Sequence, residues 1–134
     1  MKIKGVIFDM DGVLLNSEVL YQRFWLEALH YYGYPAKKEH ILALRSLTGK
    51  NAELKLKSFF GDSLDYEKVK NKRIVLMDEY VRKNGVEIKK GADEILPYLK
   101  KKGIKIAFAT SSPYERAQEH LGMAGLFKYF DQCV

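Results

Sequence analysis

The chain has 134 residues, a length that suits one ordinary domain or two very small ones and excludes two large domains. Hydrophobic residues make up 47% of it and charged residues 30%, proportions typical of folded, water-soluble proteins and not of disordered tails. The formal net charge of +6 suits partners that carry phosphate, but the basic residues are spread along the chain, so we expect no nucleic-acid binding.

Two further features of the sequence concern the cellular location of the chain. No stretch is long and apolar enough for a membrane helix or for the core of a signal peptide, so we expect no membrane partner. The single cysteine, Cys133, cannot form an internal disulfide, as in proteins of a reducing compartment. Both features indicate a cytoplasmic location.

The first expected element is a strand over residues 2–8. Its run Val6-Ile7-Phe8 is apolar on both faces, as in a sheet that helices cover on each side. The strand ends in the loop Asp9-Met10-Asp11-Gly12, after which Ser17 suits the N-cap position of a helix. Helical periodicity predicts four helices in succession, over 18–32, 38–44, 52–60 and 65–83.

The pattern changes after residue 85. An amphipathic helix is expected over 92–102 and a second buried strand over 104–109, so that the two strands and the helix between them form a parallel pair. The segment Ser112-Pro113-Tyr114-Glu115 has the form of a capping box, which predicts that a helix starts there. A third strand is expected to begin within residues 129–134.

These elements predict an α/β fold with two domains. Residues 1–15 and 85–134 would form a partial Rossmann-like core with a parallel sheet, because strands alternate with crossover helices in these segments. Residues 16–84 would form an inserted, all-helical cap domain.

Two carboxylates, Asp9 and Asp11, directly follow the first strand, at the edge where open parallel sheets bind ligands. One carboxylate can attack phosphorus and form an aspartyl-phosphate, while the other protonates the departing oxygen and later accepts a proton from water. A magnesium ion would offset the repulsion between carboxylate and phosphate. Taken alone, an Asp-x-Asp-Gly segment is more often a simple turn.

A second polar cluster, Thr110-Ser111-Ser112, follows the second strand. A hydroxyl at a strand end, next to the free amides of a helix N-terminus, forms a cradle for phosphate. The alternative is that Ser112 serves only as a helix cap. Both clusters are expected at the same edge of one sheet, where they could act on one phosphate ester.

Two longer motifs contain these clusters. Residues 8–18 read Phe-Asp-Met-Asp-Gly-Val-Leu-Leu-Asn-Ser-Glu, and residues 109–113 read Ala-Thr-Ser-Ser-Pro. With these motifs the chain resembles the haloacid dehalogenase-like hydrolases, in particular their helical-cap phosphatases and the β-phosphoglucomutase group. The resemblance covers essentially the whole chain, because Gly91, Leu99, Gly103 and Tyr129-Phe130-Asp131 match the usual spacing of the family.

The resemblance implies a role for each residue of the two clusters. Asp9 would be the nucleophile and a magnesium ligand, and Asp11 would be the general acid and base and would offer the metal its backbone carbonyl. Thr110 would hold a phosphate oxygen with its hydroxyl, helped by the Ser111 amide, and Ser112 would line the substrate pocket. The implied substrate is a small phosphorylated metabolite, and the implied cofactor is Mg²⁺.

Within the cap, residues 45–50, Arg-Ser-Leu-Thr-Gly-Lys, resemble a loop that faces the active site in relatives. Arg45, Gly49 and Lys50 are therefore candidate substrate contacts. A solvent-facing role for Arg45 and Lys50 is equally compatible with the sequence. The resemblance also implies that the cap closes over the site and excludes water.

Two departures from the family pattern concern activity. Complete members continue to a later lysine and to acidic residues that complete the magnesium site, so we expect this chain to be the N-terminal part of a larger protein, completed by its C-terminal part or by a swapped copy. The mutases carry a histidine where this chain has Tyr21, which ranks a phosphatase above the alternative, a β-phosphoglucomutase-like sugar-phosphate mutase. An inactive fragment or a binding module is the remaining alternative.

Overall fold

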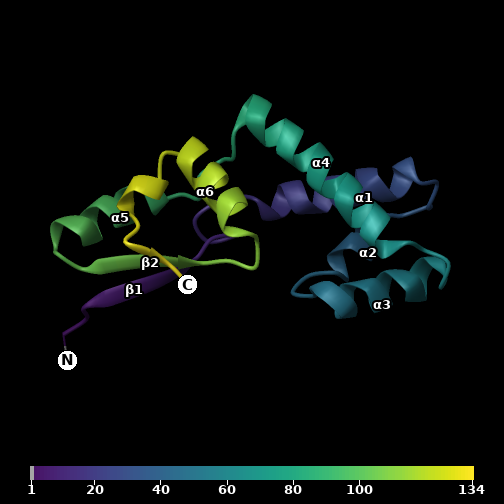
Figure 1. The fold of residues 1–134 in the computed structure, drawn as a ribbon, viewed down its shortest axis with the longest axis horizontal. Helices are drawn as coiled ribbons and strands as arrows, with labels where there is room; N and C mark the ends of the chain where they lie inside the picture. Colours follow the sequence, from purple (N-terminus) through teal and green to yellow (C-terminus); the bar gives the residue numbers. More distant parts are fainter. Residues whose placement is uncertain (1) are drawn as a thin grey trace. The chain divides into compact units, whose positions relative to one another are not determined.

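The computed structural model describes residues 2–134, which form the expected α/β fold (Figure 1). These residues group into two compact units. The first unit contains the residues up to Glu18 together with Val81–Val134, and the second contains Val19–Tyr80. None of the helices in the described part of the chain is long and apolar enough to cross a membrane.

Three short strands form one parallel sheet in the first unit. β1 (Gly5–Asp9) pairs with β2 (Lys105–Ala109), and β2 pairs with β3 (Gln132–Cys133). The order β1-β2-β3 leaves β1 at one edge of the sheet that the described residues form. Asp9 lies opposite Ala109, so β1 and β2 end at the same edge and the polar residues that follow them are neighbours.

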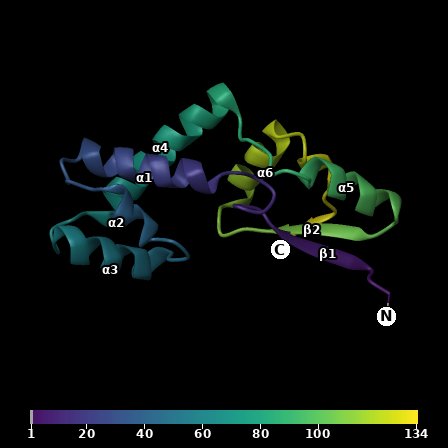
Figure 2. The same ribbon diagram turned by 180° about the vertical axis from the view of Figure 1, so that it is seen from behind.

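Helices α5 (Ala92–Lys101) and α6 (Tyr114–Met123) lie on the same side of this sheet in both views (Figure 1, Figure 2). α5 precedes β2 in the chain, and α6 and the 3₁₀ helix η1 (Phe127–Tyr129) lie between β2 and β3. The connections from β1 to β2 and from β2 to β3 therefore each cross over through helices to a parallel strand. The fully buried side chains of this unit include Met10, Leu14, Leu15, Leu96, Ile106, Phe108, Leu121 and Leu126.

The opposite face of the sheet carries no helix of the first unit in either view of residues 2–134 (Figure 1, Figure 2). Ile7, in the middle of β1, is 62% exposed, and Ile3, just before the strand, is 64% exposed. By contrast, Ile106 and Phe108 on β2 are buried. The expectation that helices cover β1 on both faces is therefore wrong for the described residues, because α5 and α6 cover one face only.

The second unit is all helical. Its helices are α1 (Glu18–Tyr31), α2 (Lys38–Leu42), α3 (Gly49–Phe60) and α4 (Tyr66–Asn84), of which α1 and α4 extend into the first unit. In its core the indole ring of Trp25 stacks on the Tyr66 ring, with centroids 5.9 Å apart. The buried Arg73 guanidinium lies 4.9 Å from the ring centres of both Trp25 and Tyr21.

The chain leaves the first unit and returns to it through two segments that pair with each other. The Asn16 amide donates a hydrogen bond to the Glu87 carbonyl at 2.8 Å, and the Lys89 amide donates to the Leu14 carbonyl at 2.9 Å. The two ends of the inserted segment are therefore fixed side by side within the first unit. The cap domain expected over 16–84 stays a prediction.

Asp131 extends the pairing between β2 and the segment before β3. Its carboxylate accepts a hydrogen bond from the Ile106 amide at 2.8 Å, and its own amide donates to the Ile106 carbonyl at 2.7 Å. The Lys100 ammonium lies 3.7 Å from the same carboxylate. The pKa of Asp131 is lowered, mainly by the hydrogen bond from the Ile106 amide and further by the ammonium groups of Lys100 and Lys105.

We expect the Asp131 carboxylate to stabilise the fold while it is charged. Because its folded pKa is below the unfolded value, this contribution is present above the ordinary Asp pKa of about 3.9 and is lost as the pH falls through the folded pKa. Asp131→Asn should therefore lower the melting temperature near neutral pH, and the difference should shrink in acid. Thermal unfolding followed by circular dichroism from about pH 7 to about pH 3 measures it.

The control for this prediction is Glu87→Gln, which removes an exposed charge from the same unit while the backbone carbonyl of residue 87 stays in place. This variant should show a much smaller change in melting temperature near neutral pH. Equal losses for the two variants at every pH would contradict the role assigned to Asp131.

Candidate functional site

The loop after β1 is held by backbone hydrogen bonds. The Met10 amide donates to the Ala109 carbonyl at 3.1 Å, which continues the contact with β2 by one residue. The Leu15 amide donates to the Met10 carbonyl at 3.1 Å, and the Gly12 amide donates to the Leu15 carbonyl at 2.9 Å. The loop therefore folds back on itself, with Asp11 at its turn.

The backbone at position 12 favours glycine. Gly12 has a φ of +80°, a region where an L side chain is strained. A Cβ added there would also lie 2.6 Å from a carboxylate oxygen of Glu18, the first residue of α1. The Glu18 side chain thus packs against the turn that carries Asp11.

Two hydroxyl groups hold the Asp11 carboxylate. Ser17 Oγ donates to Asp11 Oδ1 at 2.6 Å, and Thr110 Oγ1 donates to Asp11 Oδ2 at 3.4 Å. Asp11 and Thr110 are 99 positions apart in the sequence. The structure therefore brings together the two polar clusters that follow β1 and β2, at the carboxyl edge of the sheet.

The other carboxylate, Asp9, differs from Asp11 in its exposure and in its polar contacts. It is exposed at the last position of β1, and no hydrogen bond or ion pair of its side chain occurs among residues 2–134. Asp9 is therefore free to approach a ligand, whereas Asp11 is already oriented.

The Thr110-Ser111-Ser112 segment follows β2 directly. The Ser112 amide donates to Thr110 Oγ1 at 3.1 Å, so the Thr110 hydroxyl joins its own loop to Asp11. Ser111 is exposed and Ser112 is half-buried. The three residues lie between β2 and α6, where a phosphate cradle was expected.

Ser112 is not the N-cap residue of α6, where the capping-box pattern placed it. The N-cap position of α6 is Pro113, with no side-chain cap hydrogen bond, and the helix begins at Tyr114. The physical reason is that Pro113 has an extended backbone, with ψ at 148°, so it lies outside the helix and not in its first turn.

Arg45, Gly49 and Lys50 belong to the second unit. Gly49 begins α3 with a φ of +54°, and Lys50 Nζ lies 2.8 Å from Glu53 Oε1, with 74% of the Lys50 side chain exposed. Arg45 is exposed. A substrate contact by these three residues stays a prediction.

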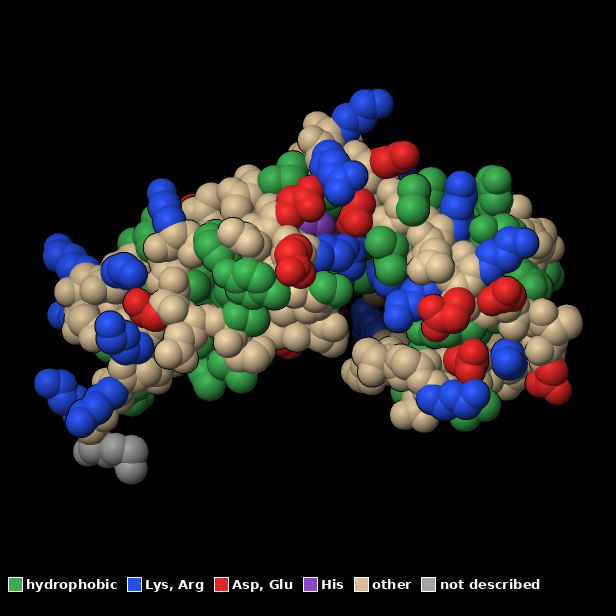
Figure 3. All heavy atoms as spheres, viewed as in Figure 1, with side chains coloured by type: hydrophobic (Ala, Val, Ile, Leu, Met, Phe, Trp, Pro, Cys, Tyr) green, Lys and Arg blue, Asp and Glu red, His purple; other side chains and the backbone are tan. Residues whose placement is uncertain are grey.

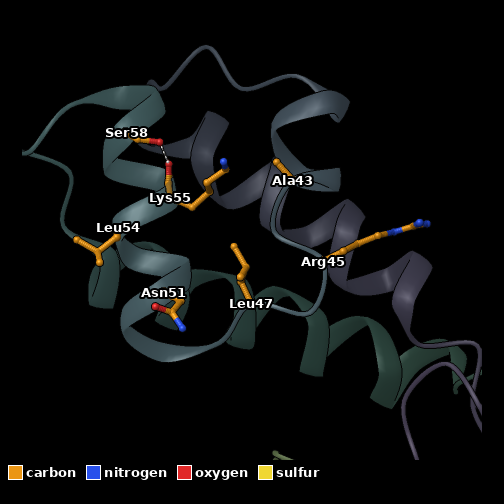
Figure 4. A pocket seen from close by; sticks show the side chains of 7 residues that line it. All are labelled: Ala43, Arg45, Leu47, Asn51, Leu54, Lys55 and Ser58. Carbon is orange, nitrogen blue, oxygen red and sulfur yellow. Dashed lines mark hydrogen bonds between the residues drawn. The ribbon is translucent and has the colours of Figure 1, made fainter.

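A shallow hollow of about 640 Å³ lies next to Arg45, between the loop after α2 and the helix α3 (Figure 4). The Arg45 side chain points away from it, and Leu47 points into it (Figure 4). The hollow is lined by Ala43, Arg45, Leu47, Asn51, Leu54, Lys55 and Ser58. On the face drawn in Figure 3, basic side chains predominate at the left end of the picture, and basic and acidic side chains are mixed toward the right.

Ser17 and Glu18 are the contacts that sequence reasoning missed. Both were expected only at the start of a helix. Ser17 and Glu18 follow Asp11 by six and seven residues, and Gly12 between them would allow the loop to fold back toward the Asp11 carboxylate. The residue types alone do not show that the loop folds back.

Comparison with known protein families identifies the chain. The family model described as haloacid dehalogenase-like hydrolase matches residues 6–134. The chain belongs to this family. The resemblance seen in the sequence motifs is confirmed, and both polar clusters lie within the matched residues.

Curated relatives of this haloacid dehalogenase-like chain are named phosphatases. The phosphorylated carbohydrates phosphatase of Thermotoga maritima is 32% identical over 142 residues, covering 98% of this chain and 61% of that protein. Pyrophosphatase PpaX of Bacillus mycoides is 28% identical over 144 residues, covering 100% of this chain and 60% of that protein. The chain thus spans about three fifths of the length of the curated relatives it matches.

Several solved structures share the fold of this chain. A hydrolase from Pseudomonas syringae superposes with a TM-score of 0.78 at 25% identity, covering 98% of this chain and 60% of that one. A β-phosphoglucomutase from Clostridium difficile superposes with a TM-score of 0.73 at 22% identity, covering 98% of this chain and 61% of that one. The likeness to the mutase shows the fold alone.

Phosphatases of this family generally use Mg²⁺, which raises the question of whether the residues present fit that ion. Within residues 2–134, no group of three or more His, Cys, Asp or Glu side chains is arranged to hold a metal. Mg²⁺ commonly takes one or two protein carboxylates and completes its six ligands with waters and substrate phosphate. Asp9 fits this pattern because its carboxylate is exposed, whereas both oxygens of Asp11 are engaged by hydroxyls.

Gly12→Ala tests the account of the loop. The substitution should lower the free energy of unfolding by about 1–2 kcal/mol, because alanine is strained at positive φ and its Cβ displaces Glu18. Denaturant unfolding measures the change.

Gly122→Ala is the matched control, because Gly122 is exposed within α6 and nothing lies within 4 Å of an added Cβ. Alanine there should stabilise the chain by about 0.5–1 kcal/mol through helix propensity. A Gly12→Ala variant as stable as the wild type would refute the constraint on the turn.

Proposed function

We propose that this chain is the N-terminal part of a magnesium-dependent phosphatase that hydrolyses a phosphoric monoester of a small metabolite. The observation that carries the proposal is the hydrogen bond from Thr110 to Asp11, which joins the two polar clusters at one edge of the sheet. Asp9 would be the nucleophile, Asp11 the general acid and base, and Thr110 and Ser111 the phosphate-binding residues. The printed names of the curated relatives support this reaction class.

The different states of the two carboxylates support separate roles. Asp9 is exposed and unengaged, as a nucleophile must be, and would attack phosphorus to form an aspartyl-phosphate. The bond from phosphorus to the ester oxygen would break as Asp11 donates a proton to that oxygen. Asp11 would then accept a proton from the water that attacks the aspartyl-phosphate, which returns Asp9 and releases phosphate.

Magnesium would be held by the Asp9 carboxylate and the Asp11 backbone carbonyl. When bound, it supplies positive charge that lowers the repulsion between the Asp9 carboxylate and the phosphate dianion. Thr110 would donate its hydroxyl proton to a phosphate oxygen, the Ser111 amide would bind another, and Ser112 would line the pocket. A cytoplasmic location belongs to the same proposal.

The alternative of a sugar-phosphate mutase finds less support. At the position where the mutases of this group carry a histidine, this chain has Tyr21, whose ring faces the Arg73 guanidinium at 4.9 Å. A phenol in that environment does not replace an imidazole, which exchanges protons near neutral pH. A product assay with a hexose phosphate separates the two activities, because a mutase moves the phosphate and a phosphatase releases it.

The unpaired edge and the uncovered face of the sheet support the proposal that a further polypeptide completes the domain. β1 is an edge strand of the described sheet, and Ile3 and Ile7 are exposed beside it. An unpaired edge with exposed apolar side chains is a template for another strand. We therefore propose that polypeptide equivalent to the remaining two fifths of the relatives pairs with β1 and covers Ile7.

Ile7→Lys tests this surface. The wild-type chain is mixed with the segment of the Thermotoga maritima phosphatase that does not align with this chain. The two should form a complex, which size-exclusion chromatography with light scattering measures. Ile7→Lys should weaken this complex roughly tenfold or more, because it places a charge in an apolar contact. Val75→Lys, on an exposed residue of α4 in the second unit, is the control and should bind as the wild type does. Equal binding by the two variants would rule out the Ile7 face.

Asp9→Asn tests the nucleophile. The wild-type chain, assayed with the same complementing polypeptide, should release phosphate from an aryl phosphate when Mg²⁺ is present and lose this activity when the metal is chelated. Asp9→Asn should reduce turnover to the background rate without lowering the melting temperature, because an amide does not attack phosphorus. Asp62→Asn, in the exposed loop before α4, is the charge-matched control. Turnover that persists in Asp9→Asn would exclude Asp9 as the nucleophile.

A further inference from the structure

We propose that Ser17 is a positioning residue, which holds one oxygen of the Asp11 carboxylate while the other oxygen is released to act on the substrate. The inference rests on the proposed role of Asp11 as general acid and base. It assigns a function to a serine that has no part in the attack on phosphorus or in the binding of phosphate.

The Ser17–Asp11 contact is short, and its donor is buried. Ser17 is fully buried, and its Oγ lies 2.6 Å from Asp11 Oδ1, a length typical of a strong hydrogen bond from a hydroxyl to a carboxylate. A buried hydroxyl has little water to bond instead, which strengthens its preference for this partner. Oδ1 is therefore firmly held.

The second oxygen, Oδ2, is held more weakly. Thr110 Oγ1 lies 3.4 Å from it, near the outer limit for a hydrogen bond. Thr110 Oγ1 also accepts the Ser112 amide at 3.1 Å and has a single proton to donate. When that proton turns to a phosphate oxygen, as proposed for Thr110, Oδ2 is released and Oδ1 stays bound to Ser17.

Asp11 would then meet the substrate in a defined orientation. With Oδ1 fixed by Ser17, the proton that Asp11 donates is carried on Oδ2 and passes to the leaving oxygen, and Oδ2 later accepts the proton from water. Without the Ser17 hydroxyl, the carboxylate could rotate about its side-chain bonds. Oδ2 would then lose the orientation on which proton transfer depends.

A purely structural role, as the N-cap of α1, is the competing explanation for Ser17. An N-cap uses a lone pair of the side-chain oxygen to accept a hydrogen bond, whereas positioning of Asp11 uses the hydroxyl proton. Ser17→Thr keeps both capacities and Ser17→Ala removes both. Ser17→Gly removes the hydroxyl but remains nearly as good an N-cap as serine. The three variants therefore separate the two roles.

The decisive measurement is the side-chain conformation of Asp11, read from three-bond NMR couplings and the carboxyl ¹³C signal of the full chain without substrate. The wild type and Ser17→Thr should each show one χ1 rotamer, and Ser17→Ala and Ser17→Gly should show averaging over several. A single rotamer in both hydroxyl-free variants would overturn the proposal, as would a Ser17→Gly variant that matches the wild type. Should Ser17→Ala fail to fold, Ser17→Gly decides the outcome alone.

A kinetic measurement tests the consequence. In the aryl phosphate assay, Ser17→Ala and Ser17→Gly should lower kcat about tenfold with little change in KM, and Ser17→Thr should restore it. A rise in KM at constant kcat would contradict a role through Asp11. The NMR result does not depend on hydrolysis, so an Asp9→Asn variant that retains turnover would refute the proposed nucleophile and leave the Asp11 rotamer result standing.

Discussion

In-register pairing of two parallel strands is the constraint on which the candidate site depends. Asp9 on β1 lies opposite Ala109 on β2, so the residues that follow the two strands emerge at one edge. The loop after β1 folds back, and Asp11 meets the hydroxyl of Thr110. A shift of the register by one residue would turn these side chains to the other face of the sheet and separate them.

The site consists of one free carboxylate and one restrained carboxylate. Asp9 is exposed at the strand end, whereas hydroxyls from two different segments orient Asp11. Both carboxylates come from a span of three residues, and their different surroundings suit them to different steps of the same reaction. The turn that follows Asp11 depends on Gly12, because the positive φ of Gly12 lets the chain reverse and bring Ser17 within hydrogen-bonding distance of Asp11.

Much of this arrangement could be predicted from the sequence. An apolar run that ends in carboxylates, and a second that ends in hydroxyls, are local signals of strand ends, and both strands are found there. The hydrogen bond from Ser17 and the packing of Glu18 could not be predicted, because they depend on how the loop returns. The exposure of Ile7 was also missed, because an apolar run shows that a residue suits burial and not which segment covers it.

The central claim is that the two polar clusters bind one phosphate group together. Titration of the ¹⁵N-labelled chain with inorganic phosphate in the presence of Mg²⁺ tests it most directly. The amide signals of the Asp9–Gly12 turn and of the Thr110–Ser112 segment should shift together and give a single dissociation constant. Shifts confined to one segment, two different constants or no shift in either segment would contradict the account.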